Sequence, residues 1–245
     1  MRQSPLFSNI KTGEAFYDEV ECATYKGIAI KTFILLAITT IVGGAVSYYL
    51  PEIVLNNPSS FSLLIVVTSI VGFIAVMIGR LSSKNAKYAS VVYSVCEGVL
   101  LGTITTYVSF YVESAAVIAI FSTLVIFAVM LTLFTTGILR VGSKFRRFCF
   151  AFTLGAIALT LFTSIASLFI TNLNTYLDLA ITVEAALLIY GAITLGLNFA
   201  EAQSVVERGA SKDAEWSVSL GLMISIVYIY IELLRLIYLL ALRDR

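Results

Sequence analysis

The sequence predicts an all-α membrane protein with seven transmembrane helices, and two observations support that prediction. The chain has 245 residues, of which 59% are hydrophobic and only 13% charged, whereas soluble domains carry about 25% charged residues. The apolar residues also fall into runs of about twenty, the length that a helix needs to cross a hydrocarbon core of ~30 Å. A transmembrane β-barrel would show alternating segments of about ten residues, so the helical class is favoured.

Polar residues divide the chain into an N-terminal tail, residues 1–26, and a single transmembrane domain, residues 27–245. The tail is expected to be cytoplasmic, and it carries an acidic patch at residues 17–21. Pro51 is expected to end the first span, and the short turn 112–114 makes spans three and four antiparallel neighbours. The predicted spans are residues 27–50, 60–79, 88–111, 115–137, 148–170, 178–203 and 217–242.

Basic residues gather in every second connection, whereas loops 51–59, 112–114 and 171–177 contain no Lys or Arg. By the positive-inside rule, the N-terminus is then cytoplasmic and the protein lies in the cell membrane as a multi-pass protein. Arg243 and Arg245 are a signal against a seventh crossing, but the length of the last segment favours one. The basic residues that this rule places on the cytoplasmic side are Arg2, Lys11, Lys26, Lys31, Arg80, Lys84, Lys87, Arg140, Lys144, Arg146, Arg147, Arg208 and Lys212.

Composition argues against several classes of function. The chain has no histidine, so the commonest general base, zinc ligand and pH switch are absent. The net charge of +1 gives no general attraction to nucleic acid. The cysteines Cys22, Cys96 and Cys149 are isolated, and we expect free thiols. The polar N-terminus is not followed by the apolar core of a signal peptide, so we expect none to be removed.

Enzymatic readings find little support. A serine protease within the membrane needs a histidine, and an aspartyl protease needs two aspartates within spans. No zinc-protease motif and no glycine-rich phosphate loop occurs either, so we expect no catalysis, no cofactor and no resident metal. The aspartates, all at span ends or in tails, are Asp18, Asp178, Asp213 and Asp244.

Four ionisable residues lie in otherwise apolar sequence, namely Glu97, Glu201, Glu232 and Arg235. A charge in a membrane segment costs about 2.5–3.5 kcal/mol on insertion scales, so such residues usually face protein or water. At 1.5 Å per residue, Glu97 lies ~13 Å and Glu232 ~22 Å from the cytoplasmic ends of their spans. A tilt or one water could close that ~9 Å difference, and the two glutamates are candidates to line an ion pathway.

The same charged residues also have structural interpretations that require no ion pathway. Glu232 and Arg235 have the i,i+3 spacing of a same-helix ion pair, which would neutralise both without any function. Glu201 is close enough to the end of its span to reach the interface, and Glu184 is interpreted as an interfacial residue. Glycines within the spans, including Gly98, are interpreted as close-packing positions between helices; the others are Gly102, Gly155, Gly191 and Gly196.

Several motifs in order together resemble the bacterial branch of the Bax-inhibitor-like membrane proteins. They are A-T-Y-K-G-I-A-I-K-T before the first span, Y-x-x-x-E-G-x-x-x-G in the third, L-R-V-G-S-K-F-R-R-F before the fifth, and R-G-A-S-K-D-A-E-W followed by Y-I-Y-I-E-L-L-R-L at the end. The resemblance implies a last helix that is central and wrapped by the other six. It also implies a pH-sensitive calcium leak, gated by two aspartates on the last two helices that share a proton. Some bacterial relatives are linked instead to a membrane protease that they restrain.

This chain departs from that pattern at the positions of the two aspartates. Asn198 and Glu201 lie where relatives carry the first of them. Alignment on the shared L-L-R places Ser225 at the second position, whereas alignment on Tyr-x-acid places Glu232 there. Arg80 and Arg235 are the candidate charge partners.

Two functions of different classes are therefore expected. The first is a pH-sensitive cation leak channel, with calcium or protons in transit, gated by protonation of Glu97 and Glu232. The alternative is a non-transporting regulator that lies in the lipid bilayer and binds a membrane protease or another membrane protein through its tail and cytoplasmic loops.

Overall fold

The structure is a computed structural model that describes residues 22–244 except 57, 137, 139–141 and 171. The acidic patch of the tail lies outside these residues. Within them the chain forms seven helices, all long and apolar enough to cross a membrane, which confirms the predicted fold class. They are α1 (Tyr25–Asn56), α2 (Pro58–Leu81), α3 (Ala86–Ser109), α4 (Ala115–Thr135), α5 (Ser143–Ala166), α6 (Leu173–Glu207) and α7 (Ala214–Arg243).

The predicted span limits differ from the helix ends where a helix continues past the predicted span, and α5 (Ser143–Ala166) both begins and ends before its predicted limits of 148–170. The apolar span of α1 is Tyr25–Tyr49, close to the predicted end, but Pro51 does not end the helix, which continues to Asn56. A proline removes one backbone hydrogen bond, and it does not always end a helix whose other bonds persist. Likewise α6 begins at Leu173, five residues before the predicted start of its span.

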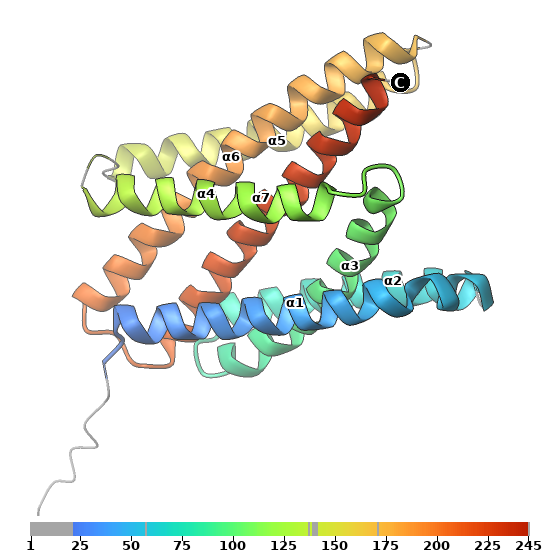
Figure 1. Cartoon of the computed structure of the whole chain (residues 1–245). Coiled ribbons are helices and arrows are strands. Elements are labelled where there is room, and N and C mark those ends of the chain that lie inside the picture. Colours follow the sequence, from blue (N-terminus) through green and yellow to red (C-terminus); the bar gives the residue numbers. More distant parts are fainter. Residues whose placement is uncertain (1–21, 57, 137, 139–141, 171, 245) are drawn as a thin grey trace, which may run out of the picture.

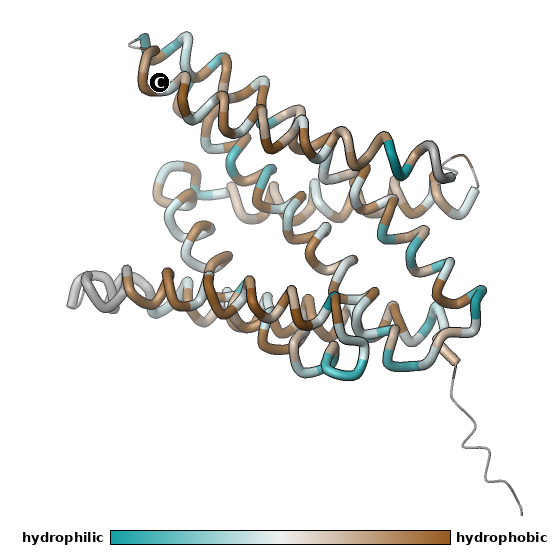
Figure 2. The backbone as a smooth tube through the Cα atoms, turned by 180° about the vertical axis from the view of Figure 1, so that it is seen from behind, coloured by the Kyte–Doolittle hydropathy of each residue, from teal (hydrophilic) through white to brown (hydrophobic). Residues whose placement is uncertain are grey.

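Two groups of helices lie on either side of α7 (Figure 1). On one side α3 packs against both α1 and α2, and on the other α6 packs against α4 and α5. Hydrophobic residues cover the length of the helices, while hydrophilic residues gather at their connections (Figure 2). This distribution is that of a bundle whose outer surface faces lipid.

The last helix, α7, is the most buried of the seven. In its apolar span 56% of the residues are buried, against 6–33% in the other six. It packs against α1, α2, α3, α4 and α6, whereas the described part of α5 packs against α6. Its sequence accounts for this position, because apolar and small residues occur on all sides of the helix.

Contacts at its two ends show that α7 runs the full length of the bundle. At its first turn Glu215 binds Lys31 of α1 (Nζ–Oε2 2.5 Å), and at its last turn Arg243 binds Asp178 of α6 (3.1 Å). Thirty residues of helix span ~45 Å, enough for a complete crossing. We call the end at which α1 begins and α7 starts the N-side, and the end at which α7 finishes the C-side.

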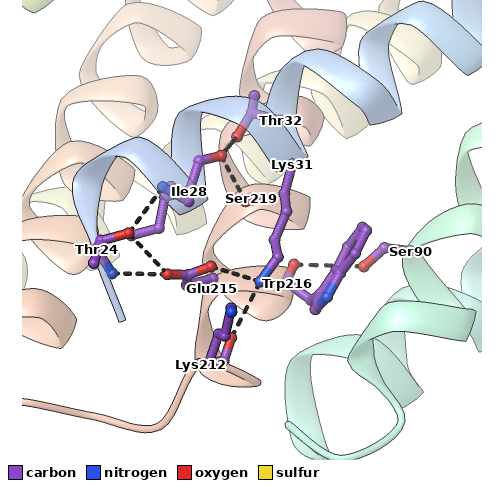
Figure 3. A network of polar contacts seen from close by, with 10 residues as sticks. Thr24, Ile28, Lys31, Thr32, Ser90, Lys212, Glu215, Trp216 and Ser219 are labelled. Atoms are coloured by element: carbon purple, nitrogen blue, oxygen red, sulfur yellow. Dashed lines mark hydrogen bonds and ion pairs between the residues drawn. The ribbon is translucent and has the colours of Figure 1, made fainter. Parts of the chain in front are cut away.

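The start of α7 is fastened to the N-terminal segment by a buried carboxylate, Glu215 (Figure 3). Its Oε1 accepts hydrogen bonds from the backbone N–H (2.7 Å) and the hydroxyl (3.2 Å) of Thr24, and its Oε2 accepts one from Lys31. Ser219, one turn further, donates to the carbonyl of Ile28 (2.9 Å). These contacts fix α1 and α7 together at the N-side.

Helices α1 and α3 cross so closely that only glycine fits at the contact. A Cβ added to Gly102 would lie 2.5 Å from the carbonyl oxygen of Gly43, and one added to Gly98 would lie 2.8 Å from that of Thr39. The prediction of close packing is confirmed for these glycines. It was wrong for Gly155, where an added Cβ would meet nothing within 4 Å.

Candidate functional site

Helices α6 and α7 carry two clusters of polar residues, one towards each end of the bundle. The N-side cluster is built around Arg80, at the end of α2. Its guanidinium donates to Glu201 of α6 (Nη2–Oε2 2.9 Å) and to the carbonyl of Ser217 of α7 (3.1 Å). One side chain thus joins three helices at this end.

Asn198 and Ser225 complete the N-side cluster. The amide nitrogen of Asn198 donates to the hydroxyl of Ser225 (2.6 Å) and to the carbonyl of Gly221 (3.0 Å). A Cβ at Gly221 would lie 2.7 Å from Arg80 and 2.9 Å from Asn198, so the glycine gives both side chains room. The structure therefore brings together four of the predicted site residues, and it places Ser225 rather than Glu232 opposite Asn198.

The second group, which we call the C-side cluster, consists of Glu184, Glu232 and Arg235. Glu232 is only 2% exposed, and its carboxyl group lies within hydrogen-bonding reach of Glu184 on α6. Glu184 and Glu232 are each eleven positions from the C-side end of their helices, which places both carboxyl groups at a depth of ~16 Å. Antiparallel packing of α6 and α7 therefore brings the two carboxyl groups to one level.

The hydrogen bonding of this carboxyl pair is incomplete. The Oε2 atoms of Glu184 and Glu232 are both buried and have no hydrogen-bond partner. Arg235 approaches the other oxygen of Glu184, Oε1, at 3.8 Å, and its side chain is half exposed. The possible same-helix pair of Glu232 and Arg235 is thus replaced by a pair between helices.

A cleft of about 400 Å³ lies beside the C-side cluster, between α5, α6 and α7. Glu184 and Arg235 line it, and so do hydroxyl groups from all three helices. The lining hydroxyls belong to Thr160, Thr163, Ser164, Ser167, Tyr176 and Tyr238. Such a lining suits water and ions better than it suits apolar molecules.

The sequence model of the family described as Bax inhibitor 1 like matches residues 4–242. The chain belongs to this family. Comparison with curated proteins and with solved structures found no significant match. The match covers six helices in full and α7 except its last residue, and so both polar clusters lie within the Bax inhibitor 1-like region.

In this Bax inhibitor 1-like chain, the recorded partner of Glu97 is a residue of its own helix rather than a member of the C-side cluster. Glu97 is half-buried in α3, where its carboxyl group is hydrogen-bonded to Tyr93 one turn earlier. Among the described contacts, the carboxyl partner of Glu232 is Glu184, not Glu97. The predicted pairing of Glu97 with Glu232 is thus not what the packing brings together.

Sequence reasoning did not place Glu184 beside Glu232 and Arg235. Glu184 was interpreted as interfacial because span six was started at residue 178, only six residues earlier. Since α6 begins at Leu173, Glu184 lies ~16 Å along the helix. Glu97 and Glu232 were selected because a charge inside an apolar run usually faces protein or water. With the correct start of α6, the same rule would have selected Glu184.

Proposed function

We propose that this protein is a pH-sensitive cation leak channel, with calcium as its main cation, in the cytoplasmic membrane. The observation that carries the proposal is Glu232, a buried carboxylate on the most buried helix with one oxygen left without a partner. Burying such a group costs several kcal/mol and stabilises nothing by itself. Carboxylates retained within membrane segments mark ion or proton pathways in many transport proteins, and the family resemblance points the same way.

The two polar clusters suggest how such a channel would be controlled. On the C-side, Glu184 and Glu232 offer oxygen ligands to a cation. On the N-side, Arg80 bridges α2, α6 and α7 and would hold that end closed through Glu201. Removal of the charge on Glu201, to which Arg80 donates, would loosen the N-side closure. Glu97 remains a candidate for the lining, and its role is open to the same assay.

Reconstituted protein in liposomes that contain a calcium-sensitive dye tests the proposal. We expect leak that changes between about pH 5 and 8, and an altered pH response in Glu232→Gln. Glu113→Gln is a matched control, because Glu113 is exposed in the turn between α3 and α4. Flux no greater than that of empty liposomes throughout this pH range would overturn the proposal.

The orientation belongs to the same proposal. The basic connections at the N-side support a cytoplasmic N-terminus by the positive-inside rule. The C-side cleft would then face the exterior, and cations would enter through it. No catalytic step is part of this mechanism, and we propose that the protein is not an enzyme.

A second candidate is a regulator that binds a membrane protease or another membrane protein. One observation favours it, since the backbone of Ala23 donates to the carbonyl of Ala210 in the α6–α7 connection (2.8 Å). A partner of the tail would therefore act next to the start of α7. Pull-down from solubilised membranes, with and without residues 1–21, tests this function. Capture that is unchanged by the truncation would exclude the tail as the binding element.

A further inference from the structure

We propose that Glu184 and Glu232, together with hydroxyl groups of the C-side cleft, form a binding site for a divalent metal cation. This inference rests on the proposed leak function, for which it names the binding site of the permeant ion. It is carried by three properties of the C-side cluster, namely its unpaired oxygens, its charge and its access to the cleft.

The unpaired oxygens are the first property. Buried polar atoms in native structures nearly always have a hydrogen-bond partner, yet Oε2 of Glu184 and Oε2 of Glu232 both lack one. The two residues face each other at the same depth, and Glu232 is only 2% exposed. Two neighbouring buried acceptors without a donor are what a bound cation would satisfy.

The charge of the surroundings is the second property. Arg235 is the one cation recorded beside the pair among the described residues, and it reaches only Glu184, at 3.8 Å. The residues of α5 that line the cleft are uncharged and carry hydroxyl groups. Besides Glu184 and Arg235, α6 and α7 contribute the phenol groups of Tyr176 and Tyr238 to the lining. Tyr228, also on α7, lies against Glu232. With both carboxyl groups ionised, the site keeps a net charge of about −1, which attracts a cation.

The ligand set favours calcium over softer metals. Carboxylate, hydroxyl and water oxygens are hard ligands that suit calcium and magnesium, and calcium accepts six to eight of them in irregular geometry. Within the described residues, no group of three or more acidic, cysteine or histidine side chains gathers to hold a metal. Two carboxylates completed by hydroxyls and water therefore predict weak binding, with a dissociation constant on the order of 0.1–1 mM.

Access through the cleft is the third property. Its volume of about 400 Å³ would hold roughly a dozen waters at ~30 Å³ each, so an ion can arrive with part of its hydration shell. Glu184 is in the lining, whereas Glu232 is not among the lining residues and contacts Glu184. A cation would thus meet Glu184 first and then bridge to Glu232, in competition with a proton shared by the pair.

The test is equilibrium binding of radioactive calcium to the purified protein in detergent micelles. We expect about one calcium ion per chain, displaced by excess magnesium but not by an equal excess of sodium, and weaker binding as the pH falls. Glu184→Gln and Glu232→Gln should each reduce the affinity at least tenfold, whereas Glu113→Gln should not change it. Glu184 is the less buried of the pair, so its variant supplies the comparison if Glu232→Gln fails to fold.

Calcium binding tests the proposed cation site, and liposome flux tests the proposed leak function, so the two measurements can fail independently. Absence of binding to the wild type, affinity unchanged in Glu184→Gln, or equal displacement by sodium would each overturn the cation site. A protein that binds calcium with these properties yet shows no liposome flux would keep the site and refute the leak. Flux without binding at the pair would refute the site and keep the leak.

Discussion

Loss of the Lys31 ammonium should destabilise the whole bundle, because it leaves a buried carboxylate without its counter-charge. The carboxyl group of Glu215 is only 1% exposed, and Lys31 is 13% exposed on its side chain. In Lys31→Met the carboxylate keeps the two hydrogen bonds from Thr24 but loses the cation at 2.5 Å. The apolar part of the lysine side chain is retained by methionine, so the variant isolates the charge.

The expected magnitude follows from what remains around Glu215. Removing one partner of a buried ion pair costs about 3–5 kcal/mol, because the other charge stays behind. The bonds from Thr24 place Lys31→Met near the lower limit, at about 3 kcal/mol. Glu215→Gln should cost less, about 1.5–3 kcal/mol, because the freed lysine can still donate to the carbonyl of Lys212 and reach water.

The chain contains its own probe for this measurement. Trp216 is the only tryptophan, and its ring lies 5.1 Å from the Lys31 ammonium. Chemical unfolding in detergent micelles, followed by tryptophan fluorescence, would give the free energy of unfolding of each variant. Lys26→Met is the control, because Lys26 is exposed and lies earlier in the same helix. A loss below about 1 kcal/mol for Lys31→Met, or a larger loss for Glu215→Gln, would refute the reasoning.

Three further outcomes are expected. Gly102→Ala should lower the unfolding free energy by about 1–3 kcal/mol, since its Cβ would meet the Gly43 carbonyl. Gly44→Ala is the control and should be neutral or stabilising, because there is open space around Gly44. Equal effects of the two substitutions in the same unfolding assay would contradict the close crossing of α1 and α3. Arg80→Gln should raise calcium flux in dye-loaded liposomes several-fold at neutral pH, and unchanged flux would exclude Arg80 as the N-side closure. Asp244→Cys, in a background without the native cysteines, should react with an impermeant thiol reagent added to intact cells; labelling only after permeabilisation would mean that α7 does not cross with its end outside.

Much of the fold could be predicted because membrane insertion constrains the sequence directly. A span must be apolar for about twenty residues, and each of the seven runs indeed became a helix. What the sequence could not show is where helices extend into polar regions, because backbone hydrogen bonds continue there without an apolar signal. Pro51 illustrates this, since α1 runs past it to Asn56, and so does the early start of α6.

The candidate site was harder to predict, because it depends on which helix faces which. The cost of a charge within a membrane span drew attention to Glu232 and Arg235. Both residues of α7 have the same partner on α6, because Glu184 binds Arg235 and also lies against Glu232. Depth along a span selects many candidates, but the rotation of each helix about its axis is set by side-chain packing. Glu97 has a suitable depth and faces Tyr93 instead.

The distribution of acids between the two clusters limits where any response to pH can arise. On the N-side, Asn198 and Ser225 are hydrogen-bonded to each other, and neither can gain or lose a proton near neutral pH. Glu201 is the one carboxylate recorded in that cluster, and it is held by Arg80 at 2.9 Å. The paired carboxyl groups of Glu184 and Glu232 lie on the C-side. A pH response that survives Glu201→Gln therefore does not need the link between Glu201 and Arg80, whereas one that is lost in that variant does.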